Sequence, residues 1–316
     1  MALAFLPGTM RADFASGDVF AGVGGGRVFR YDQNGNLLQT FTGPYAGSET
    51  TGMAFDTSGH LYSTNFEANK IVEYAQDGTV LNASFGSGFN ADPESMLLNK
   101  SGHFYVGQAD GAHTILEFDG AGTLVATHQP TSFANRGTDW IDLASDQKTM
   151  FYDGEGRIIK RFDVSTNTQL ADFYSGGTEL FALRLLSDGS ILAANGFTGD
   201  VIHVDSGGNL IHTYHVQNGG TLFALNIDPD GTSFWTADIF STEIYHIDIA
   251  TGTILKSWKA NKDGATEVAG LSVFGEITQG GPGPGPGTVP EPSTLSLLGT
   301  AAGFAAWRLR KTISRG

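Results

Sequence analysis

Short runs of alternating apolar and polar residues, separated by turns rich in glycine and aspartate, cover most of this chain. Residues 52–85, GMAFDTSGHLYSTNFEANKIVEYAQDGTVLNASF, contain four such runs. Alternation with a period of two, together with β-branched and aromatic residues, predicts strands rather than helices. Asp77-Gly78 is a strong hairpin signal, because glycine adopts positive φ without steric cost. The segment is therefore predicted to form four short strands joined by tight turns.

The four-strand pattern recurs along the chain. The third strand of each unit ends on a large apolar residue, and these residues lie 42–44 positions apart. They are Tyr31, Tyr74, Phe118, Phe162, Val204 and Ile247. A four-stranded unit of this length is typical of a propeller blade. We therefore predict an all-β protein with a six-bladed β-propeller over residues 17–276.

The first unit lacks its leading strand, and the missing strand is found at the other end of the repeat region. Residues 268–274, VAGLSVF, are similar to the leading strand at 180–186, LFALRLL. The N- and C-terminal strands are therefore predicted to share blade one. Closing the ring in this way removes exposed sheet edges.

The second unit resembles known propeller repeats. GMAFDTSGHLY, NKIVEY and QDG, all within residues 52–78, match the NHL pattern, and LYSTNFEANKIVEY resembles YVTN repeats. The resemblance covers about 240 residues and implies a six-bladed propeller of the gluconolactonase-like superfamily. It does not imply one activity, because such propellers host many functions.

A tail of different composition follows the repeats. Residues 277–288 are rich in glycine and proline, which cannot pack a core and are typical of a linker. Residues 289–316 contain Pro290, Glu291 and Pro292, then an apolar run at 295–307. A basic cluster closes the tail: Arg308, Arg310 and Lys311.

This order of short motif, predicted hydrophobic helix and basic end resembles the PEP-CTERM sorting signal of exopolysaccharide-producing Gram-negative bacteria. The resemblance implies export, transient anchoring in the inner membrane and processing by an exosortase-type enzyme. The mature protein is then expected at the cell surface, at the outer membrane or in the extracellular matrix. A minimal permanent anchor is the alternative, although the apolar run is shorter than the roughly 20 residues of a usual span. Both alternatives place the propeller outside.

Residues 1–16 leave two interpretations open, the remnant of an export signal and a disordered leader. The apolar run near the start is too short for a signal core and has no basic residues before it.

Charge and composition exclude some functions. The formal net charge is −15, and the tail after Pro292 carries four cations and no acid, so the rest of the chain carries −19. Such a body repels nucleic acid, which excludes that class of partner. The absence of cysteine excludes disulfides and thiolate chemistry.

No GxSxG, HExxH or cysteine motif is present, and we assign no catalytic or cofactor-binding residue. Four acids precede predicted innermost strands: Glu94, Asp139, Glu179 and Glu267. Their side chains are expected to meet at one mouth of the central channel. Oxygen ligands in flexible geometry favour Ca²⁺, and the resemblance to lactonases implies a divalent cation there. The alternative is an electronegative rim without metal.

The leading hypothesis is a monomeric binding or scaffold module that recognises exopolysaccharide or a surface protein through its loops. Aromatic loop residues could stack on sugar rings or pack locally; these are Tyr45, Phe89, Phe133 and Phe240. The alternatives are a metal-dependent lactonase or related hydrolase, and a streptogramin-lyase-like enzyme. Whether the protein is an enzyme stays open, with binding favoured.

Overall fold

The computed structural model describes residues 13–134, 136–217 and 219–281. In this part of the chain the regular structure is β-strand, apart from one short 3-10 helix, η1 (Ala260–Asp263). None of the helical structure described is long and apolar enough to cross a bilayer. The chain divides into two units, Met1–Gly285 and Pro286–Gly316. The predicted sorting motif, hydrophobic helix and basic cluster lie outside the described residues, as do most of the linker and the start of the leader.

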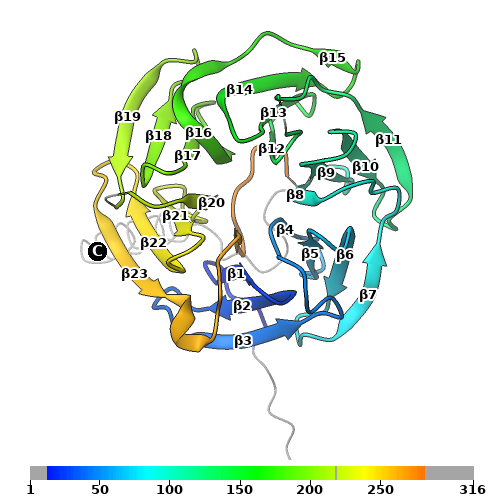
Figure 1. The fold of residues 1–316 in the computed structure, drawn as a ribbon, viewed down its shortest axis with the longest axis vertical. Coiled ribbons are helices and arrows are strands. Elements are labelled where there is room, and N and C mark those ends of the chain that lie inside the picture. The colour runs from blue at the N-terminus through cyan, green and yellow to red at the C-terminus, as the bar shows by residue number, and fades with distance from the viewer. Residues whose placement is uncertain (1–12, 135, 218, 282–316) are drawn as a thin grey trace, which may run out of the picture. The chain divides into compact units, whose positions relative to one another are not determined.

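Four four-stranded antiparallel sheets stand around a common axis in the first unit (Figure 1). Their strands are given from the axis outward. The first sheet has β24 (Gly270–Val273), β1 (Val19–Val23), β2 (Arg27–Tyr31) and β3 (Leu37–Thr42). The second has β4 (Met53–Phe55), β5 (Leu61–Asn65), β6 (Lys70–Tyr74) and β7 (Val80–Phe85). The third has β8 (Pro93–Leu98), β9 (Phe104–Gln108), β10 (Ile115–Phe118) and β11 (Leu124–His128). The fourth has β20 (Leu222–Ile227), β21 (Ser233–Asp238), β22 (Glu243–Asp248) and β23 (Ile254–Lys259).

The remaining strands form one eight-stranded sheet. Its first half comprises β12 (Trp140–Leu143), β13 (Thr149–Asp153), β14 (Gly156–Asp163) and β15 (Thr168–Gln169). Its second half comprises β16 (Tyr174–Leu185), β17 (Ile191–Asn195), β18 (Asp200–Val204) and β19 (Leu210–His215). β14 pairs with both β13 and β16, and the two-residue β15 pairs with the end of β14.

The propeller fold is confirmed, but the prediction of six separate four-stranded blades is wrong, because the structure has four. The difference arises where predicted blades four and five meet. The turn at residues 165–167 contains no glycine, and only Thr168 and Gln169 continue the pairing beyond it. The start of β14 pairs instead with the start of β16, with Ile159 opposite Tyr174. One long strand thereby joins the two predicted blades.

Ring closure by the two ends of the repeat region is confirmed. β24 pairs antiparallel with β1, with Gly22 opposite Gly270 and Val19 opposite Val273. A Cβ atom at Gly270 would overlap the carbonyl oxygen of Thr51. Glycine is therefore required where β24 passes the second sheet, since an added side chain would push the two sheets apart.

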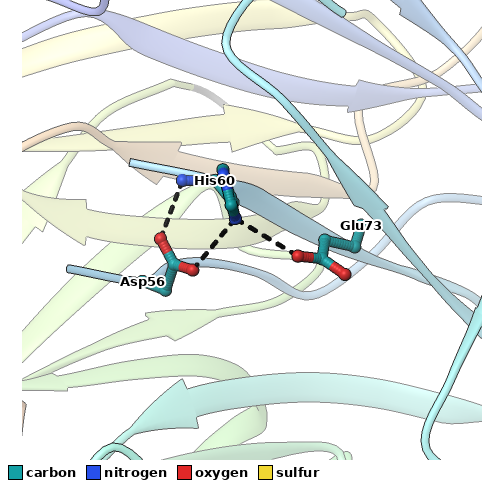
Figure 2. Close-up of side chains that lie close together, drawn as sticks. All are labelled: Asp56, His60 and Glu73. Carbon is teal, nitrogen blue, oxygen red and sulfur yellow. Dashed lines mark hydrogen bonds and ion pairs between the residues drawn. The ribbon is translucent and has the colours of Figure 1, made fainter. Parts of the chain in front are cut away.

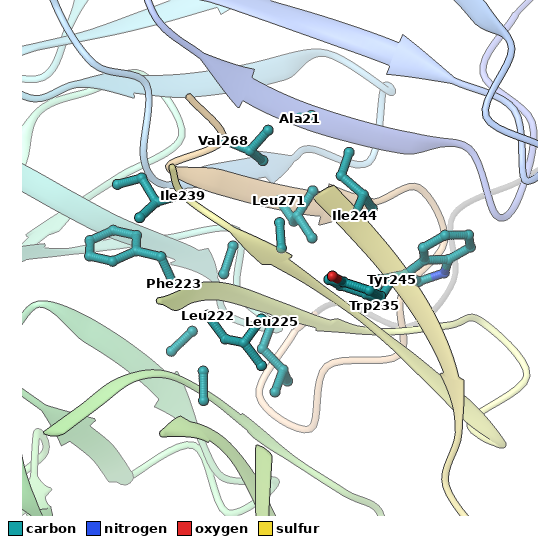
Figure 3. Close-up of a cluster of buried hydrophobic side chains, with 14 of the residues drawn as sticks. Ala21, Leu222, Phe223, Leu225, Trp235, Ile239, Ile244, Tyr245, Val268 and Leu271 are labelled. Atoms are coloured by element: carbon teal, nitrogen blue, oxygen red, sulfur yellow. The ribbon is translucent and has the colours of Figure 1, made fainter. Parts of the chain in front are cut away.

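Apolar side chains fill the spaces between neighbouring sheets. In the cluster of Figure 3, Leu222 and Leu225 of β20 pack with Trp235 of β21 and with Leu271 of β24. All four side chains are buried. Trp235 also stacks on His246, with ring centroids 4.0 Å apart. Burial of this kind, about 1.5–3 kcal/mol for each large apolar side chain, holds each sheet to the next.

The segment that follows β24 covers one end of the axis, where the innermost strands end. Glu276 accepts hydrogen bonds from Asn226 Nδ2 at 2.7 Å and Arg184 Nε at 3.2 Å. Further along, Gln147 Nε2 donates to the carbonyl of Gly280 at 3.0 Å. Figure 1 shows this segment crossing the centre of the ring. The other end of the axis, where the innermost strands begin, is formed by loops.

Candidate functional site at the acidic mouth

Acidic side chains gather at the end of the axis where the innermost strands begin. We call this group the acidic mouth: Glu49, Glu67, Asp92, Glu94, Asp110, Asp139, Asp153, Glu155, Glu179 and Glu267, together with Arg136. They lie before or within innermost strands, or at the ends of second strands and in the loops that follow them. Alternating strand direction brings all these loops to one end of the ring.

Three carboxylates of the acidic mouth are almost fully buried. Glu94 is 1% exposed, and Asp139 and Asp153 are 0% exposed. Oε2 of Glu94 and both carboxylate oxygens of Asp139 and Asp153 accept no hydrogen bond from the described residues. Buried polar atoms are nearly always hydrogen-bonded, because removing them from water without a partner is unfavourable. Other buried polar atoms, such as Asn226 Oδ1, also lack a hydrogen bond from the described residues, but at the mouth three carboxylates do so together.

Burial controls the ionisation of these groups. Burial raises the pKa of Glu94, Asp139 and Asp153 well above the usual range for carboxyl groups. Repulsion by Asp139 raises the pKa of Glu94 further, and Arg136 opposes both effects. The mouth thus favours bound protons or another positive charge.

Arg136 is the cation among these acids. Its Nη1 donates to Asp110 Oδ2 at 3.1 Å, and its Nη2 donates to Glu155 Oε1 at 2.8 Å. Its Nε lies 4.0 Å from Asp139 Oδ2. The guanidinium group therefore ties together three loops, those before β10, before β12 and after β13.

Glu49 and Glu179 are less buried, but their pKa values are also raised. Burial, followed by repulsion from Glu267 and Glu67, raises the pKa of Glu49 to about 7. Burial and then Glu155 raise the pKa of Glu179. Glu49 and Glu179 therefore also bind protons more readily than free carboxylates do.

The four acids predicted as a calcium site all belong to the mouth, but they differ in position. Glu94 is the second residue of β8, and Asp139 directly precedes β12. Glu267 lies three residues before β24, whereas Glu179 lies inside the long strand β16 rather than at its start. Glu94 and Asp139 are buried, while Glu179 and Glu267 are partly exposed.

The distances between potential metal-ligand atoms distinguish the four predicted acids from a second group of residues. In the part of the chain that the structure describes, one group of three or more His, Asp or Glu has all its ligand atoms within 4.8 Å of one another. It consists of Asp56, His60 and Glu73, which lie outside the mouth. The four predicted acids are thus not arranged as a preformed metal site, and Ca²⁺ binding by them stays a prediction.

Sequence reasoning missed Asp153 and Arg136. Asp153 occupies a recurring position, because the second strands of five repeats end on a polar residue: Asn65, Gln108, Asp153, Asn195 and Asp238. Gln108 Nε2 donates to Thr114 Oγ1 at 2.7 Å, and Asp238 Oδ2 accepts the Thr221 N–H at 2.6 Å. The repeat could have identified Asp153 as a mouth residue, but not its lack of a partner.

Two phenylalanines are strongly exposed in loops on the same end of the ring. Phe240 follows β21 and is 73% exposed, and Phe197 follows β17 and is 58% exposed. Phe197 adopts φ 64°, which is unfavourable for a bulky residue. Its ring contacts the buried Phe181, with centroids 5.9 Å apart. An exposed aromatic ring in a strained loop is a feature that binding sites share.

The other predicted aromatic residues pack locally. Tyr45 donates from its hydroxyl to the carbonyl of Ala83 at 2.8 Å. Phe89 packs on Phe118, with ring centroids 5.4 Å apart. Phe133 packs on Tyr152 with a centroid separation of 6.0 Å. Of the four, Phe240 therefore has the most free surface, and Phe197 was not predicted.

The tail matches a known sorting signal. Residues 288–311 match the model of the PEP-CTERM protein-sorting motif. The motif implies export, membrane-associated sorting and processing by an exosortase-type enzyme. No curated protein matches the chain.

Solved structures are similar to the propeller in fold. A chain of the nidogen/laminin complex is 12% identical with a TM-score of 0.64, covering 82% of this chain and 99% of that one. The WD40 propeller domain of Doa1 is 15% identical with a TM-score of 0.59, covering 82% and 83%. Virginiamycin B lyase from Staphylococcus aureus is 13% identical with a TM-score of 0.52, covering 66% and 69%. At such identities the likeness concerns the fold alone.

Proposed function

We propose that this protein is an exported binding module that presents the acidic mouth at the cell surface or in an exopolysaccharide matrix. The buried carboxylates of Glu94, Asp139 and Asp153, which lack hydrogen bonds from the described residues, carry the proposal. Buried polar groups that lack hydrogen bonds reduce the stability of the fold, and such groups are typical of functional sites. The exposed ring of Phe240 on the same end adds an apolar surface for a ligand.

The repeat supports a finer description of the architecture. The two halves of the eight-stranded sheet, 140–173 and 180–214, correspond in sequence to two NHL- or YVTN-like repeats that the pairing of β14 with β16 joins. The domain order is a leader at 1–16, the propeller at 17–276, a linker at 277–288 and the sorting segment at 289–316. The propeller acts as a monomer, and its C-terminal helix inserts into the membrane only until processing.

The chemistry of the mouth favours certain ligands. Its surplus of carboxylates repels polyanions, so a neutral or amine-bearing polysaccharide fits better than an acidic one. Aromatic rings such as those of Phe240 and Phe197 can stack on sugar rings. Ca²⁺ held by Glu94, Asp139, Glu179 or Glu267 would reduce the repulsion and admit acidic sugars as well.

Binding of polysaccharides with and without calcium tests this function. Phe240→Ala should weaken binding by about 1 kcal/mol, roughly fivefold, because it removes a stacking surface. Leu255→Ala is the matched control, since Leu255 is 51% exposed on the outer strand β23. Absence of binding to any neutral, amine-bearing or acidic polysaccharide, in either condition, would exclude a glycan-binding role.

A metal-dependent lactonase or related hydrolase is the second candidate. The raised carboxyl pKa values beside Arg136 favour it, because perturbed groups of this kind also serve general acid–base catalysis. Calcium-dependent turnover of a lactone that is lost in Asp139→Asn would support this candidate over the binding module. A streptogramin-lyase-like activity has only the shared fold in its favour.

Processing of the tail gives an independent prediction. In a native host, mass spectrometry of the mature protein should find a C-terminus close to the motif formed by Pro290, Glu291 and Pro292. Replacing these three residues by alanine should leave a full-length protein in the membrane fraction. An intact C-terminus on surface-located wild type would show that the tail is a permanent anchor.

A further inference from the structure

A histidine lies between two carboxylates on the second sheet, away from the acidic mouth. His60 Nδ1 is 3.2 Å from Asp56 Oδ2 and 3.2 Å from Glu73 Oε1. Figure 2 shows the imidazole between the two acids. The group belongs to the β4–β5 turn and to β6, at the end of the innermost strand opposite the mouth.

The turn and the strand register position these side chains. Asp56 Oδ1 accepts the N–H groups of Ser58 and His60 at 2.9 and 2.8 Å, so Oδ2 is the oxygen turned to the imidazole. Glu73 lies directly opposite Tyr62 in the β5–β6 pair. The Tyr62 hydroxyl donates to Glu73 Oε1 at 3.0 Å. Both carboxylates are thus held in place by groups other than the His60 imidazole.

A single ring nitrogen cannot satisfy both acids with one strong hydrogen bond. Nδ1 carries at most one hydrogen, and its two equal distances of 3.2 Å are long for a charge-assisted hydrogen bond. A positive ion between the three atoms interacts with all of them at once. The arrangement therefore favours a cation over a shared proton.

The third sheet contains a natural comparison at the same repeat positions. There Asn99 replaces the aspartate of the turn, and its Oδ1 accepts the N–H groups of Ser101 and His103. His103 Nδ1 then makes one short contact with Glu117 Oε1, at 2.7 Å. Glu117 Oε2 is also 3.0 Å from His128 Nε2, so this glutamate lies between two histidines. Among the described residues these three do not have all their ligand atoms within 4.8 Å of one another, whereas Asp56, His60 and Glu73 do.

We propose that Asp56 Oδ2, His60 Nδ1 and Glu73 Oε1 bind a divalent transition metal of the Zn²⁺ class. All three atoms lie within 4.8 Å of one another. One imidazole and two carboxylates suit Zn²⁺ and its neighbours better than Ca²⁺ or Mg²⁺. The side chains of His60, Asp56 and Glu73 are 34%, 20% and 17% exposed, which leaves a further position for water. A metal here links the β4–β5 turn to β6, independently of any ligand at the mouth.

Calorimetric titration of the full chain with Zn²⁺ tests the site. The buffer contains millimolar Ca²⁺, so that any site made of carboxylates only is occupied by Ca²⁺ and does not contribute to the signal. Wild type should bind one ion and melt at a higher temperature when it is bound. Asp56→Asn should reduce the affinity at least roughly tenfold. Asparagine already occupies this turn position in the third sheet, so the variant should keep its fold. His60→Asn should reduce the affinity similarly.

His103→Asn is the matched control, because it removes the equivalent histidine of a sheet whose turn carries Asn99 in place of the aspartate. It should bind Zn²⁺ as wild type does. Wild type that binds no Zn²⁺, or Asp56→Asn that binds it with unchanged affinity, would overturn the proposal. An equal loss of affinity in His103→Asn would overturn it as well, because it would place the ion on the third sheet.

Discussion

A chain that ends at residue 265 should fail to form a cooperatively folded propeller, whereas a chain that ends at residue 281 should form one. The shorter chain lacks β24, the innermost strand of the first sheet, which pairs with β1. Its loss leaves the inner edge of β1 without a partner. Unpaired edges of this kind favour aggregation.

The packing lost with β24 is comparable to the stability of a whole domain. Val268, Leu271 and Val273 are at most 1% exposed. Burial of such side chains contributes about 1.5–3 kcal/mol each, or roughly 5–9 kcal/mol for the three. The free energy of unfolding of a typical domain is about 5–15 kcal/mol. The shorter chain should therefore have little or no net stability.

Thermal and denaturant unfolding, together with light scattering, measure the effect. The chain ending at 281 is the control, because it keeps β24 and the segment from Glu276 to Gly280 that covers the end of the axis. If the shorter chain unfolds with the same midpoint and cooperativity as the control, ring closure through β24 does not support the fold.

Asp153→Asn should stabilise the protein, by about 1–3 kcal/mol at about pH 8. Asp153 is fully buried, and its carboxylate oxygens accept no hydrogen bond of good geometry from the described residues. The backbone N–H of Trp140 only partly offsets the effect of burial on its pKa. Asparagine has nearly the same shape and no charge, so the variant avoids the cost of burying a carboxylate. Removing the charge also reduces the repulsion that raises the pKa of Asp139.

The gain should depend on pH in a defined direction. Burial raises the pKa of Asp153 well above its value in an unfolded chain. Between the two values the folded state holds a proton that the unfolded state has lost, so wild-type stability falls as the pH rises through this window. Asparagine does not titrate. The difference in free energy of unfolding between the variant and wild type should therefore be largest at about pH 8 and small at about pH 5.

Asp238→Asn is a matched control at the equivalent position of the fourth sheet. Its Oδ2 accepts hydrogen bonds from Gln217 Nε2 and from the Thr221 N–H, both at 2.6 Å. This carboxylate is paired, so the substitution should destabilise by about 1–3 kcal/mol. Urea unfolding of both variants at the two pH values compares them. A destabilising Asp153→Asn would mean that the buried carboxylate has a partner that stabilises it.

Local patterns in the sequence determined most of the architecture. The two-residue alternation and the Asx-Gly turns depend on neighbouring residues only, so they identified the strands and their repeat without tertiary information. Ring closure was predicted from the similarity of residues 268–274 to other leading strands. The sorting motif is contiguous, and for this reason it could be identified from Pro290, Glu291 and Pro292 with the segment that follows.

The joining of predicted blades four and five was decided by tertiary structure. It depends on the pairing of β14 with β16, in which Gly156 lies opposite Leu180. Both segments have strand character in either arrangement, so local pattern does not choose between a fourth strand after residue 165 and a continuous β16. The weak turn at 165–167 indicated the place but not the outcome.

The chemistry of both sites also depended on tertiary structure. Sequence position identified Glu94 and Asp139 as mouth residues, because acids before innermost strands converge at one end of the ring. It did not show that Asp153 is buried without a partner, since hydrogen bonding is a property of the assembled loops. Likewise, the contact of His60 with Glu73 requires the β5–β6 register and the Asp56 turn together. Strands and repeats follow from local preferences, whereas the pairing and solvation of individual charges follow only from how distant segments pack.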